Sequence, residues 1–204
     1  GLPRSHASIQ GNALGSCCRC GLGRDPRADQ LAAALVSWQW PDGGWNCDAR
    51  SGGYRSSFHE TTGAAWGLFE YAEATGNSAA REAADRACEL FLEHRVFRRL
   101  GDGDVIHPMW LRLRYPPYWH YGILPALILL TRLGKVRDPR AADALDELEK
   151  RRLSDGRWAS QGQWWKPTGS SVTPEVVDWG GSGRPNPMLT FHALRILQAA
   201  GRLD

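Results

Sequence analysis

Hydrophobic residues recur along this chain of 204 residues at spacings of three and four, which is the period of an amphipathic helix. No segment shows the strict alternation of apolar and polar residues that is typical of a half-buried strand. The pattern therefore predicts an all-α protein, with helices at about residues 6–21, 27–40, 57–75, 78–96, 117–133, 139–152 and 187–200.

Two kinds of helix alternate in this prediction. The segments 27–40 and 139–152 are amphipathic, because one face is apolar and the other carries charged residues. By contrast, 57–75 and 117–133 are apolar nearly all round, which is typical of helices that are buried on most sides. Alternating buried and amphipathic helices predict two concentric layers, an α/α toroid. We expect one domain over residues 1–204, built as a partial ring of about three helical hairpins plus a closing helix.

The sequence repeats itself at an offset of 113 residues, the distance from Arg24 to Arg137. At this offset the five-residue motif that begins at Arg24 recurs unchanged, and the Asp-Gly-x-Trp motif that begins at Asp42 recurs at Asp155. A degenerate copy lies between them, so the repeating unit has about 55–60 residues, enough for two helices and two loops. Such a unit cannot bury its apolar face alone, and neighbouring units must therefore stack.

The segment from Gln39 to Trp45 has the pattern Gln-x3-Gly-x-Trp. This pattern resembles the QW repeat of squalene-hopene and oxidosqualene cyclases, which are α/α toroids of the terpenoid cyclase and protein prenyltransferase superfamily. The resemblance implies a central apolar cavity that binds an isoprenoid or similar hydrophobic small molecule, with cyclisation or isomerisation as the expected activity. We expect the QW residues to be structural staples, with the Trp over the end of the outer helix and the Gln amide on its exposed carbonyl groups.

The catalytic motifs of this superfamily do not occur in the sequence. Its class II cyclases protonate their substrate with an Asp-x-Asp-Asp acid, and other members hold metal-bound diphosphate with Asp-Asp-x-x-Asp; this chain has neither. Its protein prenyltransferases hold zinc with Asp, Cys and His, and Cys47, Asp48 and His59 are of these types without matching that pattern. We therefore predict no metal and no cofactor. A non-catalytic binding or scaffold protein on the same fold is the alternative to an enzyme.

In a toroid the cavity lies at the N-terminal ends of the inner helices, where N–H groups and positive dipole ends converge. At these ends we predict Glu60, His59 and His120 as catalytic residues, because a carboxyl in a dry cavity has a raised pKa and can act as an acid. The structural alternatives are that Glu60 forms a capping box with Ser57 and that His120 is a core histidine. We also expect these catalytic candidates and Tyr121 to point toward one central space. The predicted ligand-binding residues lie at the same helix ends or in the long loop before the last helix: Gln10, Asn12, Trp66, Tyr118, Trp119, Tyr121, Trp164, Trp165, Trp179 and Asn186.

Composition and charge narrow the choice of partners. The net charge of +3 is small and the charges are interspersed, so we expect no nucleic-acid partner. The longest apolar run, 121–130, is too short for a transmembrane helix. The five cysteines are an odd number, which favours reduced thiols and a cytoplasmic setting. Because a full toroid of this superfamily has about twice as many hairpins, we expect a homo-oligomer or a second subunit that completes the ring, unless the chain is a fragment.

Overall fold

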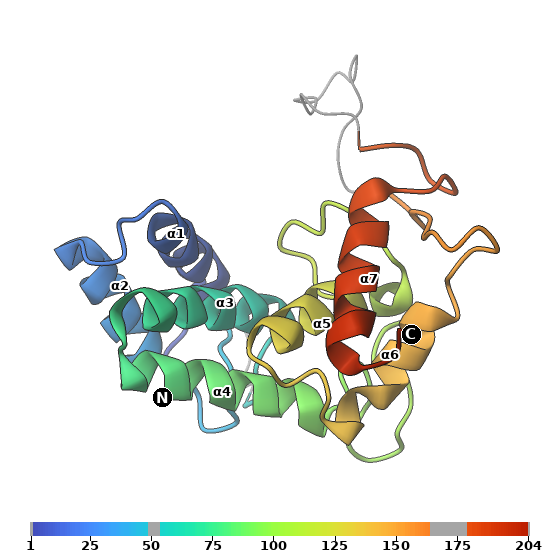
Figure 1. Cartoon of the computed structure of the whole chain (residues 1–204). Coiled ribbons are helices and arrows are strands. Elements are labelled where there is room, and N and C mark those ends of the chain that lie inside the picture. Colours follow the sequence, from blue (N-terminus) through green and yellow to red (C-terminus); the bar gives the residue numbers. More distant parts are fainter. Residues whose placement is uncertain (1, 49–53, 164–178, 204) are drawn as a thin grey trace, which may run out of the picture. The chain divides into compact units, whose positions relative to one another are not determined.

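The computed structural model describes residues 2–48, 54–163 and 179–203, and helices dominate these ranges (Figure 1). Their helices, seven α and two short 3-10, are α1 (Ala7–Arg19), α2 (Pro26–Ser37), α3 (Phe58–Thr75), α4 (Ser78–Glu93), η1 (Pro108–Leu111), α5 (Ile123–Arg132), η2 (Pro139–Ala141), α6 (Ala142–Glu149) and α7 (Pro187–Ala200). The same ranges contain isolated β-bridges but no strand, so the all-α prediction is confirmed. None of the described helices is both long and apolar enough to cross a membrane.

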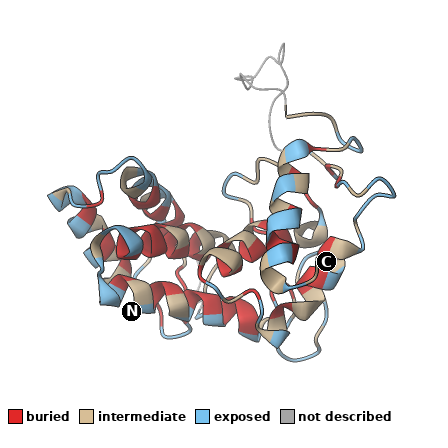
Figure 2. Cartoon of the chain, in the orientation of Figure 1, coloured by how far each residue is buried: buried red, intermediate tan, exposed pale blue. Residues whose placement is uncertain are grey.

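The chain divides into two compact units, residues 1–92 and 93–204. In the first unit α1 packs along α3, and α2 packs against both of them. In the second unit α5 packs against α6 and α7. Buried positions run along most of α3 and along one side of α4, whereas α7 keeps a row of exposed positions (Figure 2). A ring would have to involve both units, so the toroid and a single domain over 1–204 stay predictions.

Glycines bring α1 and α3 into close contact. A Cβ atom at Gly67 would lie 2.1 Å from the carbonyl oxygen of Gly11, and one at Gly11 would lie 2.2 Å from the carbonyl oxygen of Gly63. No larger side chain fits at such distances, so the two backbones touch. One turn further on, Gly15 meets the indole of Trp66. Because equal steps along both helices keep them in contact, α1 and α3 run parallel and their N-terminal ends lie together.

The two tryptophans of the repeat are buried staples, as predicted. The indole Nε1 of Trp45 donates to the carbonyl oxygen of Leu35 in the last turn of α2, at 2.9 Å. In the second copy the Nε1 of Trp158 donates to the carbonyl oxygen of Leu148 in the last turn of α6, at 2.7 Å. Both side chains are fully buried. The same local pattern therefore closes the ends of α2 and α6 in the same way.

Left-handed residues shorten two of the predicted helices. The helix predicted over 117–133 begins only at Ile123, because Tyr118 adopts a left-handed φ of 48° and Gly122, the N-cap of α5, is extended with a φ of 176°. The helix predicted over 78–96 ends three residues early, because Arg95 adopts a φ of 44°. The predicted boundaries are wrong at these ends. The aromatic segment that begins at Tyr118 therefore precedes α5 instead of forming its first turn.

Candidate functional site

Glu60 is a buried carboxylate in the first turn of α3, and it does not cap its own helix. The Ser57 hydroxyl caps α3 by accepting from the Glu60 backbone N–H at 3.4 Å, while the Ser57 N–H donates to the Trp45 carbonyl oxygen at 2.8 Å. The Ser57 N–H is thus already engaged, and the reciprocal half of a capping box does not form. Instead, Oε2 of Glu60 accepts from the backbone N–H of Ser8 in α1, at 2.9 Å.

The second oxygen of Glu60 belongs to a group of three different side chains. Oε1 lies 3.9 Å from Nδ1 of His6, the N-cap residue of α1. The thiol of Cys47, in the loop that follows Trp45, is hydrogen-bonded to the same carboxylate. One ligand atom from each of these three residues lies within 4.8 Å of the other two. Glu60 is buried, Cys47 is half-buried and His6 is exposed, so the group opens toward solvent on the side of the imidazole.

Electrostatics argue against Cys47 as a nucleophile. Burial raises the pKa of its thiol, and the negative charge of Glu60 together with the hydrogen bond to that carboxylate raises it further. A reactive cysteine needs the opposite, a positive environment that lowers the pKa and produces the thiolate near neutral pH. The group is therefore suited to hold a cation or a proton and is poorly suited to attack an electrophile.

Sequence reasoning found Glu60 and missed His6. His6 carries no motif, but it precedes the first residue of α1, and Glu60 lies in the first turn of α3. This shared position at a helix start is the signal by which the sequence could have indicated His6. In the sequence, Cys47 lies near Asp48 and His59, which are also of zinc-binding types, but in the part of the chain that the structure describes it groups with His6 and Glu60 instead. The parallel contact of α1 with α3, rather than any sequence spacing, brings these side chains together.

The other predicted residues of the first unit have different surroundings. Trp66 packs its ring against Gly15 and donates from Nε1 to Glu70 at 2.9 Å, which makes it a packing residue between α1 and α3. Asn12 is exposed, and Gln10 is half-buried with a buried Oε1 atom. Of Gln10 and Asn12, Gln10 therefore has the more buried side-chain amide.

Several predicted residues of the second unit form aromatic contacts. The ring of Tyr115 lies 5.2 Å from that of Trp179 and 5.7 Å from that of His192. Trp119 stacks on His120 with ring centroids 4.8 Å apart. Burial lowers the pKa of His120, and the charge of Arg114 also lowers it, while a backbone hydrogen bond to Pro117 acts in the opposite direction. The neutral form of the His120 imidazole is therefore favoured more than in an ordinary histidine.

Tyr121 and Asn186 have structural partners. The Tyr121 hydroxyl is buried and donates to the carbonyl oxygen of Val96 at 2.6 Å. Asn186 is the N-cap of α7: its Oδ1 accepts from the N–H groups of Met188 and Leu189 at 2.9 and 3.0 Å. Trp164 and Trp165 lie outside the described residues. The predicted convergence of His59 and Glu60 with His120 and Tyr121 would join the two units, so it stays a prediction.

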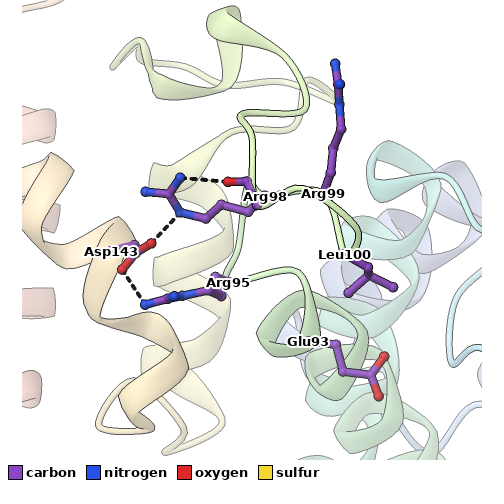
Figure 3. A pocket seen from close by; sticks show the side chains of 7 residues that line it. Glu93, Arg95, Arg98, Arg99, Leu100 and Asp143 are labelled. Atoms are coloured by element: carbon purple, nitrogen blue, oxygen red, sulfur yellow. Dashed lines mark hydrogen bonds and ion pairs between the residues drawn. The ribbon is translucent and has the colours of Figure 1, made fainter.

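A polar pocket of about 340 Å³ lies in the second unit, beside the turn that follows α4 (Figure 3). Arg95 donates to one carboxylate oxygen of Asp143 at 2.7 Å, and Arg98 donates to the other. Arg98 also donates to the carbonyl oxygen of Gly103 at 2.8 Å. One carboxylate thus pairs with two guanidinium groups. We interpret this pocket as an ion-pair network that fixes the turn on α6, rather than as a ligand site.

A second pocket of about 420 Å³ lies at the N-terminal end of α7 and is predominantly apolar. Its wall includes Asn186, which the sequence had predicted as a ligand-binding residue. Its remaining lining residues are Arg157, Pro185, Pro187, Thr190, Phe191 and Leu194. No predicted aromatic residue lines it, and Phe191 and Leu194 are lining residues that the sequence analysis missed.

Known proteins do not identify this chain. No protein-family model, no curated protein and no solved structure matches it. The resemblance of the segment Gln39–Trp45 to the QW repeat therefore stays a prediction. The function is therefore inferred from the two candidate sites themselves. The pocket on α7 in the second unit is apolar, and the group in the first unit consists of metal-ligating side chains.

Proposed function

We propose that this protein binds an isoprenoid or similar hydrophobic small molecule, with the hydrocarbon body of the ligand in the apolar pocket on α7. The observation that supports this most directly is the pocket itself, whose volume of about 420 Å³ is large enough for such a ligand. Phe191 and Leu194 line it and are 48% and 36% exposed. A ligand that covers them removes apolar surface from water, which is favourable by roughly 25 cal/mol per Å².

The polar groups beside this pocket favour an apolar ligand over a sugar or a nucleotide. The Asn186 amide is engaged on both sides, because its Oδ1 caps α7 and its Nδ2 donates to the Trp179 carbonyl oxygen at 2.6 Å. The Thr190 hydroxyl accepts from the backbone N–H of Trp158 at 3.1 Å. Arg157 forms two hydrogen bonds to Asp155, at 2.9 and 2.7 Å. A polar ligand would have to displace these bonds, whereas a hydrocarbon chain leaves them in place.

Cyclisation or isomerisation of the ligand is the finer part of the proposal. Such chemistry needs a base that removes a proton, and His120 is the candidate, because its burial lowers its pKa and so favours the neutral imidazole. Rings beside such a base would stabilise a carbocation through their faces, and Trp119 stacks on this imidazole. Turnover would require the ligand to reach these rings, which are not among the lining residues of the pocket on α7.

A non-catalytic scaffold is the second candidate, and one observation favours it. Phe191 and Leu194 lie on one face of α7, and their exposure allows a protein surface to cover them instead of a small molecule. The partner would be a second copy of the chain or another subunit. The two candidate functions differ in what covers Leu194: a hydrophobic small molecule in the first and a protein surface in the second.

Titration with farnesol, a 15-carbon isoprenoid alcohol, tests the proposed function. Leu194→Asp places a charge in the pocket, and we expect it to weaken farnesol binding by about 10- to 100-fold, because the buried Leu contact is worth roughly 1.5–3 kcal/mol. Ile9→Asp is the matched control, since Ile9 is an exposed apolar residue of α1. Equal affinity of both variants and the wild type would refute the pocket assignment. Light scattering of the same samples tests the scaffold alternative: a dimer that only Leu194→Asp dissociates supports it.

A further inference from the structure

We propose that His6, Cys47 and Glu60 form a zinc-binding site in the first unit. Their ligand atoms lie within 4.8 Å of one another, and they come from three separate segments: the start of α1, the loop after Trp45 and the first turn of α3. Imidazole nitrogen, thiolate sulfur and carboxylate oxygen are the ligand types that zinc takes in proteins. The inference does not depend on the proposed ligand pocket, which belongs to the other unit.

The geometry needs only a small adjustment. Zinc bonds of about 2.0–2.3 Å in a tetrahedral arrangement hold donor atoms about 3.3–3.8 Å apart, so the three donors must approach by roughly 1 Å. His6 can make this movement, because its side chain is 70% exposed. Three protein ligands leave the fourth position of a tetrahedral ion to water or a substrate, as in catalytic zinc sites and unlike closed structural ones.

Neighbouring backbone groups hold the ligands in place. Oε2 of Glu60 is fixed by the Ser8 N–H at 2.9 Å, which leaves Oε1 on the side of His6. The N–H of Ser5, next to His6, donates to the carbonyl oxygen of Asn46, next to Cys47, at 3.3 Å. This bond keeps the two ligand-bearing segments side by side. Such outer contacts orient metal ligands and are a regular part of metal sites.

The second copy of the repeat shows that the fold does not require these side chains. Trp45 donates from its backbone N–H to the hydroxyl of Thr61 at 3.2 Å, and Trp158 donates in the same way to Thr190 at 3.1 Å. Thr190 thus corresponds to Thr61, and the residue before each is Leu189 in one copy and Glu60 in the other. Leu189 is buried, so an apolar residue serves the packing at this place.

The thiol differs between the copies in the same way. At the repeat offset of 113 residues, Ser160 stands where the first copy has Cys47. The first copy thus has a Cys and a buried Glu at places where the second copy has Ser and Leu, so metal-ligating groups occur here in the first unit alone. A bound cation accounts for both replacements, and it also accounts for a carboxylate kept within 3.9 Å of an imidazole.

Cobalt(II), a coloured substitute for zinc, tests the site in the chain of 204 residues. The protein is first treated with a chelator, and Co²⁺ and Zn²⁺ are then titrated separately. We expect one ion per chain and the intense near-ultraviolet absorption of a thiolate–cobalt bond, which added Zn²⁺ abolishes. Cys47→Ser should remove that absorption, and His6→Ala and Glu60→Gln should each weaken Zn²⁺ binding at least tenfold. Circular dichroism confirms that each variant is folded, and Glu60→Gln retains an oxygen that accepts from Ser8.

Three other thiols of the first unit supply the control. Cys17, Cys18 and Cys20 lie together near the end of α1, and their simultaneous replacement by Ser should leave both the absorption and the stoichiometry unchanged. The proposal is overturned if the wild type shows no thiolate–cobalt absorption. It is also overturned if the absorption survives Cys47→Ser, or disappears in the triple Ser variant while Cys47 is intact.

Discussion

The carboxylate of Glu60 accepts a 2.9 Å hydrogen bond from the backbone N–H of Ser8, and it thereby caps a helix to which it does not belong. The N-cap residue of α1 is His6, whose own side chain makes no capping hydrogen bond. The first N–H groups of a helix need an acceptor, and a negative charge at that end is favourable. Glu60 therefore joins the starts of α1 and α3 and occupies one of its oxygens in doing so.

Replacement of Glu60 separates this capping role from its charge. We expect Glu60→Ala to lower the free energy of unfolding by about 1–3 kcal/mol, because a buried N–H loses its acceptor. Glu60→Gln should lose less, since the amide oxygen can still accept from Ser8. Glu82→Ala is the control, because Glu82 is exposed on α4. Urea denaturation followed by circular dichroism measures all three. Equal midpoints for the Ala variants of Glu60 and Glu82 would contradict the capping role.

The helices and the repeat could be predicted because they depend on local patterns. The capping aspartate of α2, Asp25, accepts from Arg27 N at 2.9 Å, and its copy Asp138 accepts from Arg140 N at the same distance. The predicted role of the Gln39 amide is wrong in its partner, since the amide donates to the carbonyl oxygens of Gly43 and of Ala83 in α4, at 2.7 and 2.8 Å, instead of to the end of α2. At both N-caps the accepting carboxylate and the donating N–H belong to the same short motif, so the motif itself predicts the hydrogen bond.

The site could be predicted only in part because its contacts are not local. The bond from Ser8 to Glu60 spans 52 positions in the chain, and it depends on how closely α1 approaches α3. Helix periodicity indicates which face is buried, but it does not say which neighbour the face meets or in which register. Gly11 and Gly63 set that register, and only the packed structure shows that it places His6 beside Glu60.

The tryptophan staples should carry a large share of the stability of each unit. We expect Trp45→Ala and Trp158→Ala each to cost about 3–5 kcal/mol, because each removes a fully buried indole and leaves a helix carbonyl without its donor. Trp119→Ala is the matched control, since Trp119 is 58% exposed and should have a small effect. Denaturant midpoints measure the difference. A loss of binding activity in Trp45→Ala with an unchanged midpoint would overturn the structural assignment.

The contact between α1 and α3 should not tolerate a single methyl group. In Gly67→Ala the added Cβ would lie 2.1 Å from the carbonyl oxygen of Gly11, so the helices must separate. We expect a loss of about 1–3 kcal/mol or more from overpacking. Gly101→Ala is the control, because a Cβ at Gly101 would meet no atom within 4 Å. Thermal unfolding of the two variants compares them directly, and equal melting temperatures would show that the helices are not in contact there.

The last prediction concerns the thiol of Cys47 in metal-free protein. Burial, and then the charge and hydrogen bond of Glu60, raise the pKa of this thiol. Because only the thiolate reacts with iodoacetamide, alkylation of Cys47 should reach its midpoint at a pH above the value of about 8.5 for an ordinary thiol. Glu60→Gln removes the negative charge, so the midpoint should fall. It should remain above the ordinary value, since burial is the larger cause and persists in this variant. Mass spectrometry of the Cys47 peptide, with a chelator present at each pH, measures the profile. A midpoint that Glu60→Gln leaves unchanged would mean that the carboxylate does not face the thiol, and the three-residue group would then not exist in solution.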